Sequence, residues 1–178
     1  RANPAAADDY LDPAFDEDKR QWVKRDKWPD QVIDIATAFI KQSKDLGLTP
    51  GDLKLALQSL PEQTLPLADM GMAIYADYQR ALRYRGAVDF DDLIRLALRM
   101  LQIEPDLLQR LRHQWPFILE DEAQDSSRLQ QEILNLLAGP QGNWVRVGDP
   151  NQAIYETFTT ANPRYLREFL EAEDVQSR

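Results

Sequence analysis

A change in hydrophobic spacing near residue 114 limits the folds open to this chain. After it come two short apolar runs, "PFILED" (116–121) and "NWVRVGD" (143–149), separated by an amphipathic segment of helix length (126–139). Each run is too short for a helix and leads into polar residues, so each predicts a buried strand. A further amphipathic segment (163–173) completes the order strand, helix, strand, helix, which favours a parallel sheet with crossover helices. Because two strands make a poor sheet, we expect its partner strands to lie outside this chain.

Upstream of this change the apolar residues follow helical spacing. The predicted helices cover residues 30–46, 49–60, 66–85, 88–101 and 104–114. The chain therefore divides into an irregular charged lead-in (1–29), a helical part (30–113) and the beginning of an α/β part (114–178), and its fold class is α/β.

The lead-in holds basic residues beside two tryptophans, Trp22 and Trp28. Basic and aromatic neighbours can hold a nucleic-acid backbone and stack on bases. Acidic residues nearby cancel much of that positive field, so we favour a solvated helix with both tryptophans packed beneath it.

Composition excludes several classes of function. With 43% apolar and 29% charged residues, the chain is typical of a soluble globular protein. No apolar run approaches the ~20 residues of a membrane span, and "RANPAAADDY" shows no secretion leader, so we expect a cytoplasmic protein without membrane contact. The chain has no cysteine and a single histidine, His113, which leaves little for thiol or histidine chemistry. A net charge of −9 argues against DNA binding over the whole surface, although a local basic groove stays open.

Acidic residues crowd the end of the first predicted strand in "LEDEAQD" (119–125). Ligands of parallel sheets gather beyond the carboxyl ends of the strands, where "GDPNQ" (148–152) also lies. One acid there can hold Mg²⁺, and a second can orient or deprotonate a water that attacks a phosphoryl group. The alternative is a solvated turn that is acidic without a chemical role.

The sequences "DEAQD" and "GDPNQAIY" resemble motifs II and III of the UvrD/Rep-type superfamily 1 DNA helicases, and the second is similar to the RecB/AddA-like branch. The resemblance extends over roughly residues 30 to 170, in the family's order. It includes "DFDDL" (89–93), to which we assign packing and capping. It implies a mainly helical accessory subdomain followed by part of a RecA-like P-loop NTPase parallel sheet.

The same resemblance implies a site for ATP and Mg²⁺. Asp121 matches the residue that binds the metal, and Glu122 matches the general base. Gln152 matches the catalytic glutamine that senses the γ-phosphate. Gln124 and Asp125 match cofactor-binding positions that connect the nucleotide site to neighbouring motifs.

For DNA, the resemblance implies contacts from Tyr155, and from Phe158 after a one-residue slip. The implied partners are single-stranded DNA, single-strand/double-strand junctions and the remaining motor domains of the same chain. Two departures stand out. Glu120 replaces the family's usual apolar residue, so that it either faces solvent or tunes the site, and "ETFTTANP" (156–163) lacks the arginine usual after motif III.

A phosphate-cradling G-x-x-x-x-G-K-[ST] loop is absent from the sequence. We therefore expect an internal fragment of an ATP-dependent DNA helicase that does not hydrolyse ATP by itself. One alternative is a non-motor interaction module that keeps the helicase fold. A second is a metal-dependent nuclease that uses Asp121, Glu122 and Asp125.

Overall fold

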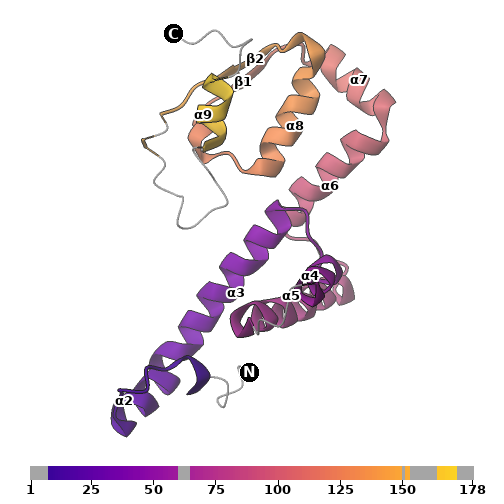
Figure 1. The fold of residues 1–178 in the computed structure, drawn as a ribbon. Coiled ribbons are helices and arrows are strands. Elements are labelled where there is room, and N and C mark those ends of the chain that lie inside the picture. The colour runs from indigo at the N-terminus through magenta and orange to yellow at the C-terminus, as the bar shows by residue number, and fades with distance from the viewer. Residues whose placement is uncertain (1–7, 60–64, 150, 153–163, 172–178) are drawn as a thin grey trace.

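The computed structural model describes residues 8–59, 65–149, 151–152 and 164–171 (Figure 1). The α-helices in these ranges are α2 (Glu17–Trp22), α3 (Trp28–Asp45), α4 (Pro50–Gln58), α5 (Pro66–Tyr84), α6 (Phe90–Ile103), α7 (Pro105–Gln114), α8 (Arg128–Ala138) and α9 (Arg164–Leu170). The strands are β1 (Ile118–Glu120) and β2 (Trp144–Arg146). Short 3-10 turns cover Asp8–Tyr10, Ala123–Asp125 and Gly139–Gln141, and a π-helical segment covers Val23–Lys27. A mostly helical chain with a small parallel sheet agrees with the predicted α/β class.

Side-chain caps explain where several helices begin. Thr49 and Asp52 form a reciprocal capping box at the start of α4, and Ser127 and Gln130 form another at the start of α8. Asp89 precedes α6 and accepts a hydrogen bond from the Asp92 amide at 2.8 Å. The capping role predicted for "DFDDL" is therefore confirmed.

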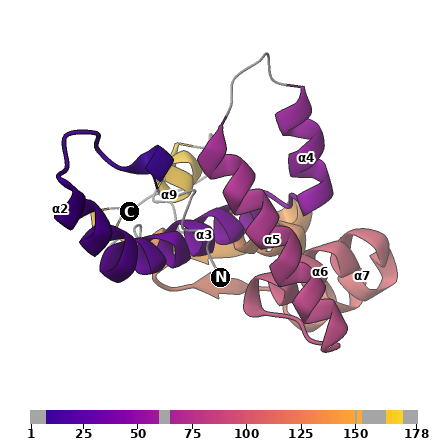
Figure 2. The same cartoon turned by 90° about the horizontal axis from the view of Figure 1, so that it is seen from below.

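The helical part is built on the crossing of α3 and α5, which lie side by side in Figure 2. Gly71 allows this close approach, because a Cβ atom at this position would lie 2.7 Å from Cγ of Phe39. Further along the crossing, Trp28 and Val32 are buried against the partly buried side chains of Met70 and Ile74. Burial of such apolar side chains supplies the main stabilising term for the helix pair.

The irregular structure expected over residues 1–29 is wrong for its second half. Helix α2, the π-helical segment and the start of α3 follow one another from Glu17 onward. Asp16 begins this helical stretch by accepting a hydrogen bond from the Lys19 amide at 2.8 Å. The favoured alternative, a solvated helix above two tryptophans, holds for Trp28, which is buried and stacks on Tyr10. Trp22 is 46% exposed instead.

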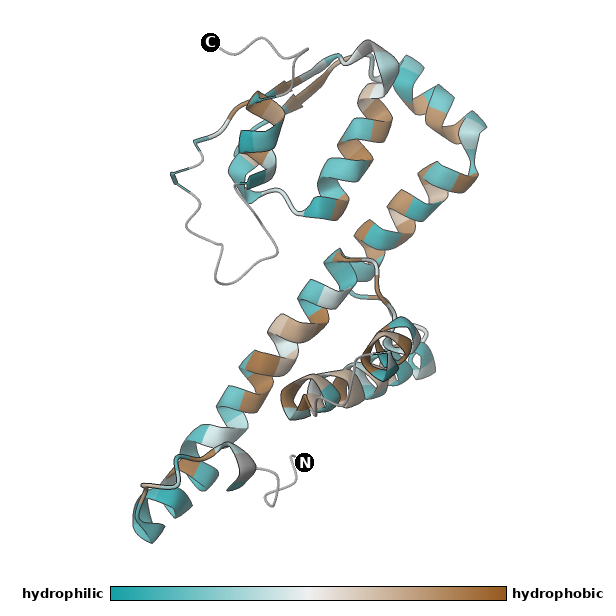
Figure 3. Ribbon diagram, viewed as in Figure 1, coloured by the Kyte–Doolittle hydropathy of each residue, from teal (hydrophilic) through white to brown (hydrophobic). Residues whose placement is uncertain are grey.

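Strands β1 and β2 pair in parallel, with Ile118 opposite Trp144 and Glu120 opposite Arg146. Helix α8 connects them and contacts both strands (Figure 1). The other face of the sheet is not covered by any residue that the structure describes there, since Leu119 is 80% exposed and Val145 is also exposed. The prediction that both strands are buried is thus wrong for one face, whose apolar residues are brown in Figure 3.

The last turn of α3 contacts both α6 and α8. Lys44 is 0% exposed, and its Nζ lies 2.5 Å from Oδ2 of Asp89 at the start of α6. The backbone oxygen of Asp45 accepts hydrogen bonds from Nε and Nη2 of Arg128 at 3.0 and 2.7 Å. The Asp45 carboxylate also accepts a bond from the second amide of α8 at 3.3 Å. Lys44 therefore links α3 to the start of α6, and Asp45 links α3 to α8, the helix that follows the acidic turn.

Candidate functional site

The parallel pairing brings the polar residues after β1 and β2 to one edge of the sheet. The ladder continues past both strands, because the Val147 amide donates to the Glu120 oxygen at 2.8 Å. The Ala123 amide in turn donates to the Val147 oxygen at 2.9 Å. These bonds fix the acidic turn against the loop that leaves β2, as expected for polar residues at the carboxyl ends of parallel strands.

Glu122 has an unusual backbone conformation within the acidic turn. Its φ of 51° and ψ of 42° are left-handed, and among the described residues it is the one non-glycine with positive φ. A glutamate in this conformation costs roughly 1–3 kcal/mol, and such strain is concentrated at functional sites. The Glu122 amide donates to Oδ1 of Asp121 at 2.9 Å, which orients the preceding carboxylate.

The buried side chain of Gln124 connects the two loops. Its Nε2 donates to Oε2 of Glu122 at 2.7 Å, and its Oε1 accepts from the Asp149 amide at 3.1 Å. Gly148 makes room for this amide, because a Cβ atom there would clash with Oε1 of Gln124 and lie 3.0 Å from the Ala123 nitrogen. Gln124 thus holds one oxygen of the Glu122 carboxylate in a defined position.

The carboxylate of Asp149 extends the connection to Gln152. Oδ2 of Asp149 accepts from Nε2 of Gln152 at 2.9 Å, and Oδ1 accepts from the Asn151 amide at 2.9 Å. These hydrogen bonds, the backbone bond from Asn151 first and then that from Gln152, hold the pKa of Asp149 below its ordinary value. Sequence reasoning missed Asp149, although an acid directly after the second strand is the same signal that identified Asp121.

The carboxylate oxygens of the acidic turn can be compared with the ligands that Mg²⁺ requires. Asp121 is exposed at the sheet edge, and Oδ1 of Asp125 is buried without a hydrogen-bond partner. Within the described ranges, no group of three or more acidic or histidine side chains is arranged to hold a metal ion. Mg²⁺ in nucleotide sites is held by one or two carboxylates, waters and phosphate oxygens, so Asp121 fits an ion carried largely by a nucleotide.

Of the two sequence expectations for Glu120, exposure to solvent is wrong, because its side chain faces the interior, whereas a role in tuning the site stays a prediction. Its side chain is 7% exposed, and its Oε2 lies 2.6 Å from Nε of the buried Arg146. Nε1 of Trp144 donates to the same oxygen at 3.1 Å. One of the crowded acids is therefore neutralised within the protein, and the others are left at the sheet edge.

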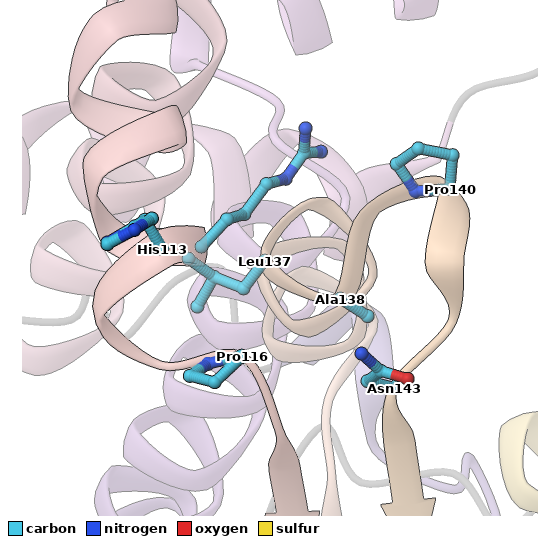
Figure 4. A pocket seen from close by; sticks show the side chains of 7 residues that line it. His113, Pro116, Leu137, Ala138, Pro140 and Asn143 are labelled. Atoms are coloured by element: carbon cyan, nitrogen blue, oxygen red, sulfur yellow. The ribbon is translucent and has the colours of Figure 1, made fainter.

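Tyr155 and Phe158, the predicted DNA contacts, lie outside the described residues. A separate hollow between α7 and α8 (Figure 4) is lined by Arg112, His113, Pro116, Leu137, Ala138, Pro140 and Asn143. Pro116 precedes β1 and Asn143 precedes β2, so this hollow lies at the opposite end of the strands from Glu122. Arg112 donates to the Leu136 oxygen at 2.8 and 2.6 Å, which ties α7 to the end of α8.

The mostly helical structure, with a parallel strand pair and an acidic turn at its carboxyl edge, defines an α/β domain. Comparison with known proteins gives the family. The family model that describes the UvrD/REP helicase N-terminal domain matches residues 7–173. The chain therefore belongs to the UvrD/Rep helicase family, which confirms the family predicted from the sequence.

Several named relatives support this membership. DNA helicase II of Escherichia coli is 32% identical over 166 residues, which cover 92% of this chain and 21% of that protein. The ATP-dependent DNA helicase PcrA of Leuconostoc citreum is 36% identical over 117 residues, or 66% of this chain and 15% of the relative. The ATP-dependent DNA helicase UvrD1 of Mycobacterium tuberculosis is 36% identical over 121 residues, 64% of this chain and 16% of the relative. The chain thus spans about a fifth or less of these proteins. None of the helices described here is both long and apolar enough to cross a membrane.

Proposed function

We propose that this chain is the part of an ATP-dependent DNA helicase that supplies the acids of the ATP site and its connection to motif III. The observation that carries the proposal is the hydrogen-bonded path from Glu122 through Gln124 and Asp149 to Gln152. It joins the two motifs that the sequence assigns to nucleotide chemistry, at the sheet edge where parallel sheets bind ligands. ATP-dependent relatives named PcrA and UvrD1 support the same assignment.

In this proposal each residue of the edge has a distinct role. Bound Mg²⁺ would neutralise charge on the β- and γ-phosphates. Asp121 would hold the ion, and Glu122 would accept the proton of the attacking water at its carboxylate. Gln124 orients that carboxylate by donating to Oε2. Gln152 exchanges its bond to Asp149 for one to a phosphate oxygen, so the presence of the γ-phosphate is transmitted to the loop after β2.

The exposed sheet face supports a RecA-like arrangement in the parent protein. Phe117, Leu119, Val145 and Val147 are all exposed on or beside the two strands. An apolar face of this kind is normally covered, and in a parallel sheet of an α/β domain it is covered by helices. We propose that the remaining motor domains of the same polypeptide, the longer parent protein, supply this cover, the additional strands and the phosphate loop. The 178-residue chain alone therefore does not hydrolyse ATP.

The further parts of the proposal concern DNA and the division of the chain. Tyr155 is the last residue of motif III and Phe158 follows it. Both would stack on bases of single-stranded DNA, with single-strand/double-strand junctions as the substrate of the parent. Residues 30–113 form the accessory subdomain and residues 114–178 the first part of the motor domain. The hydrogen bonds from Arg128 to the backbone oxygen of Asp45 would then lie between the two parts.

Steady-state ATP hydrolysis by the full-length parent, with and without single-stranded DNA, tests the function. Glu122→Gln keeps the size of the side chain and removes the base, so we expect kcat to fall by roughly 10²- to 10⁴-fold. The matched control is Glu132→Gln on α8, whose carboxylate pairs with Arg128 away from the turn. Wild-type activity in Glu122→Gln would exclude the assigned base. A parent without hydrolysis under either condition would favour the non-motor interaction module.

A further inference from the structure

The buried ion pair of Glu120 and Arg146 has no part in the chemistry proposed above, yet it lies directly beneath the acidic turn. Arg146 is 1% exposed, and its Nε and Nη2 lie 2.6 and 3.3 Å from the two carboxylate oxygens of Glu120. The residues are opposite each other in the β1–β2 register, so the pair bridges the two strands where they lead into the acidic turn and the loop after β2. A charge pair at this depth requires satisfied hydrogen bonds to be tolerated.

The remaining contacts of Arg146 point to the turn itself. Nη2 donates to the Ala123 oxygen at 3.3 Å, and Nη1 donates to Oε1 of Gln131 on α8 at 3.0 Å. The guanidinium carbon lies 4.7 Å from the ring centre of Trp144 and 5.0 Å from that of Phe169, so two aromatic rings restrict its position. A planar, forked cation can make these contacts together, whereas an ammonium group cannot.

Glu120 holds the other end of the same turn. Its Oε1 accepts a hydrogen bond from the Ser126 hydroxyl, and the pair therefore contacts the turn at Ala123 and at Ser126. Glu122, with its left-handed backbone, directly precedes the first of these two anchors. Strained conformations persist only where the surrounding structure over-determines them.

We infer that Glu120 and Arg146 are positioning residues: they keep Glu122 in the left-handed conformation that presents its carboxylate to Gln124 and to the ligand edge. The inference rests on the proposed function for its catalytic consequence, but not for its effect on the backbone. A purely structural pair could be replaced by apolar residues of similar volume without any change in the conformation of the acidic turn. A positioning pair is not, because apolar side chains cannot donate to the Ala123 oxygen.

The double variant Glu120→Leu/Arg146→Met separates the two roles. It removes both charges and so leaves no buried charge unpaired, and we expect its midpoint of urea unfolding to lie above that of the single variant Arg146→Met. The single variant Arg146→Met leaves the Glu120 carboxylate buried without its cation and should unfold at lower urea. Arg112→Met is the matched control, since it removes another arginine that donates to a backbone oxygen, at the far end of α8.

The first readout is the Glu122 backbone in the 178-residue chain, which needs no nucleotide. In the double variant we expect the Cα and carbonyl NMR shifts of Glu122 to leave their left-handed values. Exchange of the Ala123 amide, which is bonded to the Val147 oxygen, should also become faster. Arg112→Met should leave both unchanged. A double variant with wild-type stability, wild-type Glu122 shifts and wild-type exchange would overturn the inference.

The second readout is ATP hydrolysis by the full-length parent. In the double variant we expect kcat to fall by roughly 10- to 100-fold with little change in KM, since the base is misplaced while ground-state binding is kept. Full kcat in the double variant would overturn the inference, whereas a wild-type parent without hydrolysis would overturn only the proposed function. Arg146→Lys is the variant to use if the double variant does not fold. It keeps the charge against Glu120 but lacks the fork, so it should show the same shift changes, and wild-type shifts in it would equally overturn the inference.

Discussion

Gln124 illustrates how much one buried side chain determines at this site. Its amide has one donor bond to the Glu122 carboxylate and one acceptor bond from the Asp149 amide. Reversing the amide would place like groups against each other at both ends and leave buried polar atoms unpaired, at a cost of roughly 1–3 kcal/mol each. The orientation of Gln124 is therefore unique, and it relies on the space left by Gly148.

Gly148→Ala should destabilise the chain by about 1–3 kcal/mol, because the added methyl group would displace Gln124 or the turn backbone. Urea unfolding followed by circular dichroism measures this difference. Gly51→Ala is the control, since a Cβ atom there lies 3.6 Å from its nearest neighbour, Oγ1 of Thr49. Within α4 this alanine should instead stabilise by about 0.5–1 kcal/mol. Equal effects of the two substitutions would contradict the packing argument.

At the scale of secondary structure, the end of α3 and the start of α6 meet through charged side chains, and α5 adds a tyrosine hydroxyl to this contact. The last turn of α3 carries Lys44, whose Nζ also lies 3.1 Å from Oδ1 of Asp92 in α6. The Tyr78 hydroxyl of α5 donates to Oδ2 of Asp89 at 2.8 Å. Burial alone would raise the pKa of Asp89, but the hydrogen bonds from Lys44, the Asp92 amide and Tyr78 outweigh it and place the pKa below its ordinary value of 3.8.

Lys44→Met should lower the free energy of unfolding by about 3–5 kcal/mol near neutral pH, because it leaves two carboxylates without their buried cation. Asp89 has a depressed pKa in the folded state, so its contribution is complete well above pH 3.8 and is lost as the pH falls through the folded value. The difference between wild type and Lys44→Met should therefore shrink on acidification. Urea unfolding at a series of pH values measures it.

A control variant and the pKa of a neighbouring carboxyl group bear on whether the effect is specific to Lys44. Lys54→Met on the exposed side of α4 is the control and should change stability by less than about 0.5 kcal/mol at every pH. Burial, followed by the charge of Asp89, raises the pKa of the neighbouring Asp91, and the charge of Lys44 partly opposes this rise. Protonation of Asp91 therefore stabilises the fold on acidification, more so in Lys44→Met than in wild type, which reinforces the expected decrease of the difference. A difference between wild type and Lys44→Met that does not depend on pH would show that Asp89 is not coupled to Lys44.

At the scale of the whole molecule, the residues that the structure describes cover one face of the sheet and leave the other face exposed. The inner face carries Glu120 and Arg146 against α8 and α9, whereas the outer face carries Leu119 and Val145. This arrangement reverses the usual one, in which the apolar face is the buried face. It follows if the outer face is covered only in the longer parent protein.

Leu119→Lys should therefore be tolerated in the 178-residue chain and destabilising in the full-length parent protein. In the 178-residue chain it should reduce ANS binding and change the free energy of unfolding by less than about 0.5 kcal/mol. In the full-length parent the same ammonium group would be buried without a partner, at a cost of more than about 2 kcal/mol. Ile33→Lys, on an exposed position of α3, is the control and should be tolerated in both. Tolerance of Leu119→Lys in the parent would mean that the sheet face stays open.

Much of this architecture follows from local pattern. Helical spacing predicts α3 to α8 because an amphipathic stripe has to be buried, and capping residues such as Thr49 and Ser127 place the helix starts. Two short apolar runs with acids behind them predict a parallel pair with polar residues at one edge, which the register confirms. In the lead-in, whose mixed charges mask the periodicity, the division of the chain predicted irregular structure, and the favoured alternative of a solvated helix describes Glu17 to Trp28 better.

By itself, the sequence determined the family, the helices, the parallel strand pair and the edge at which Asp121, Glu122 and Gln152 gather. These features depend on the residue types along a single segment. Only the tertiary structure decided that Glu120 pairs with Arg146, that Gln124 connects Glu122 to Asp149, and that Glu122 is left-handed. Each of these depends on residues about 25 positions apart meeting at hydrogen-bond distance, or on a backbone angle that those contacts impose. Directional contacts of this kind are set by tertiary packing, and the residue pattern along a single segment does not predict them.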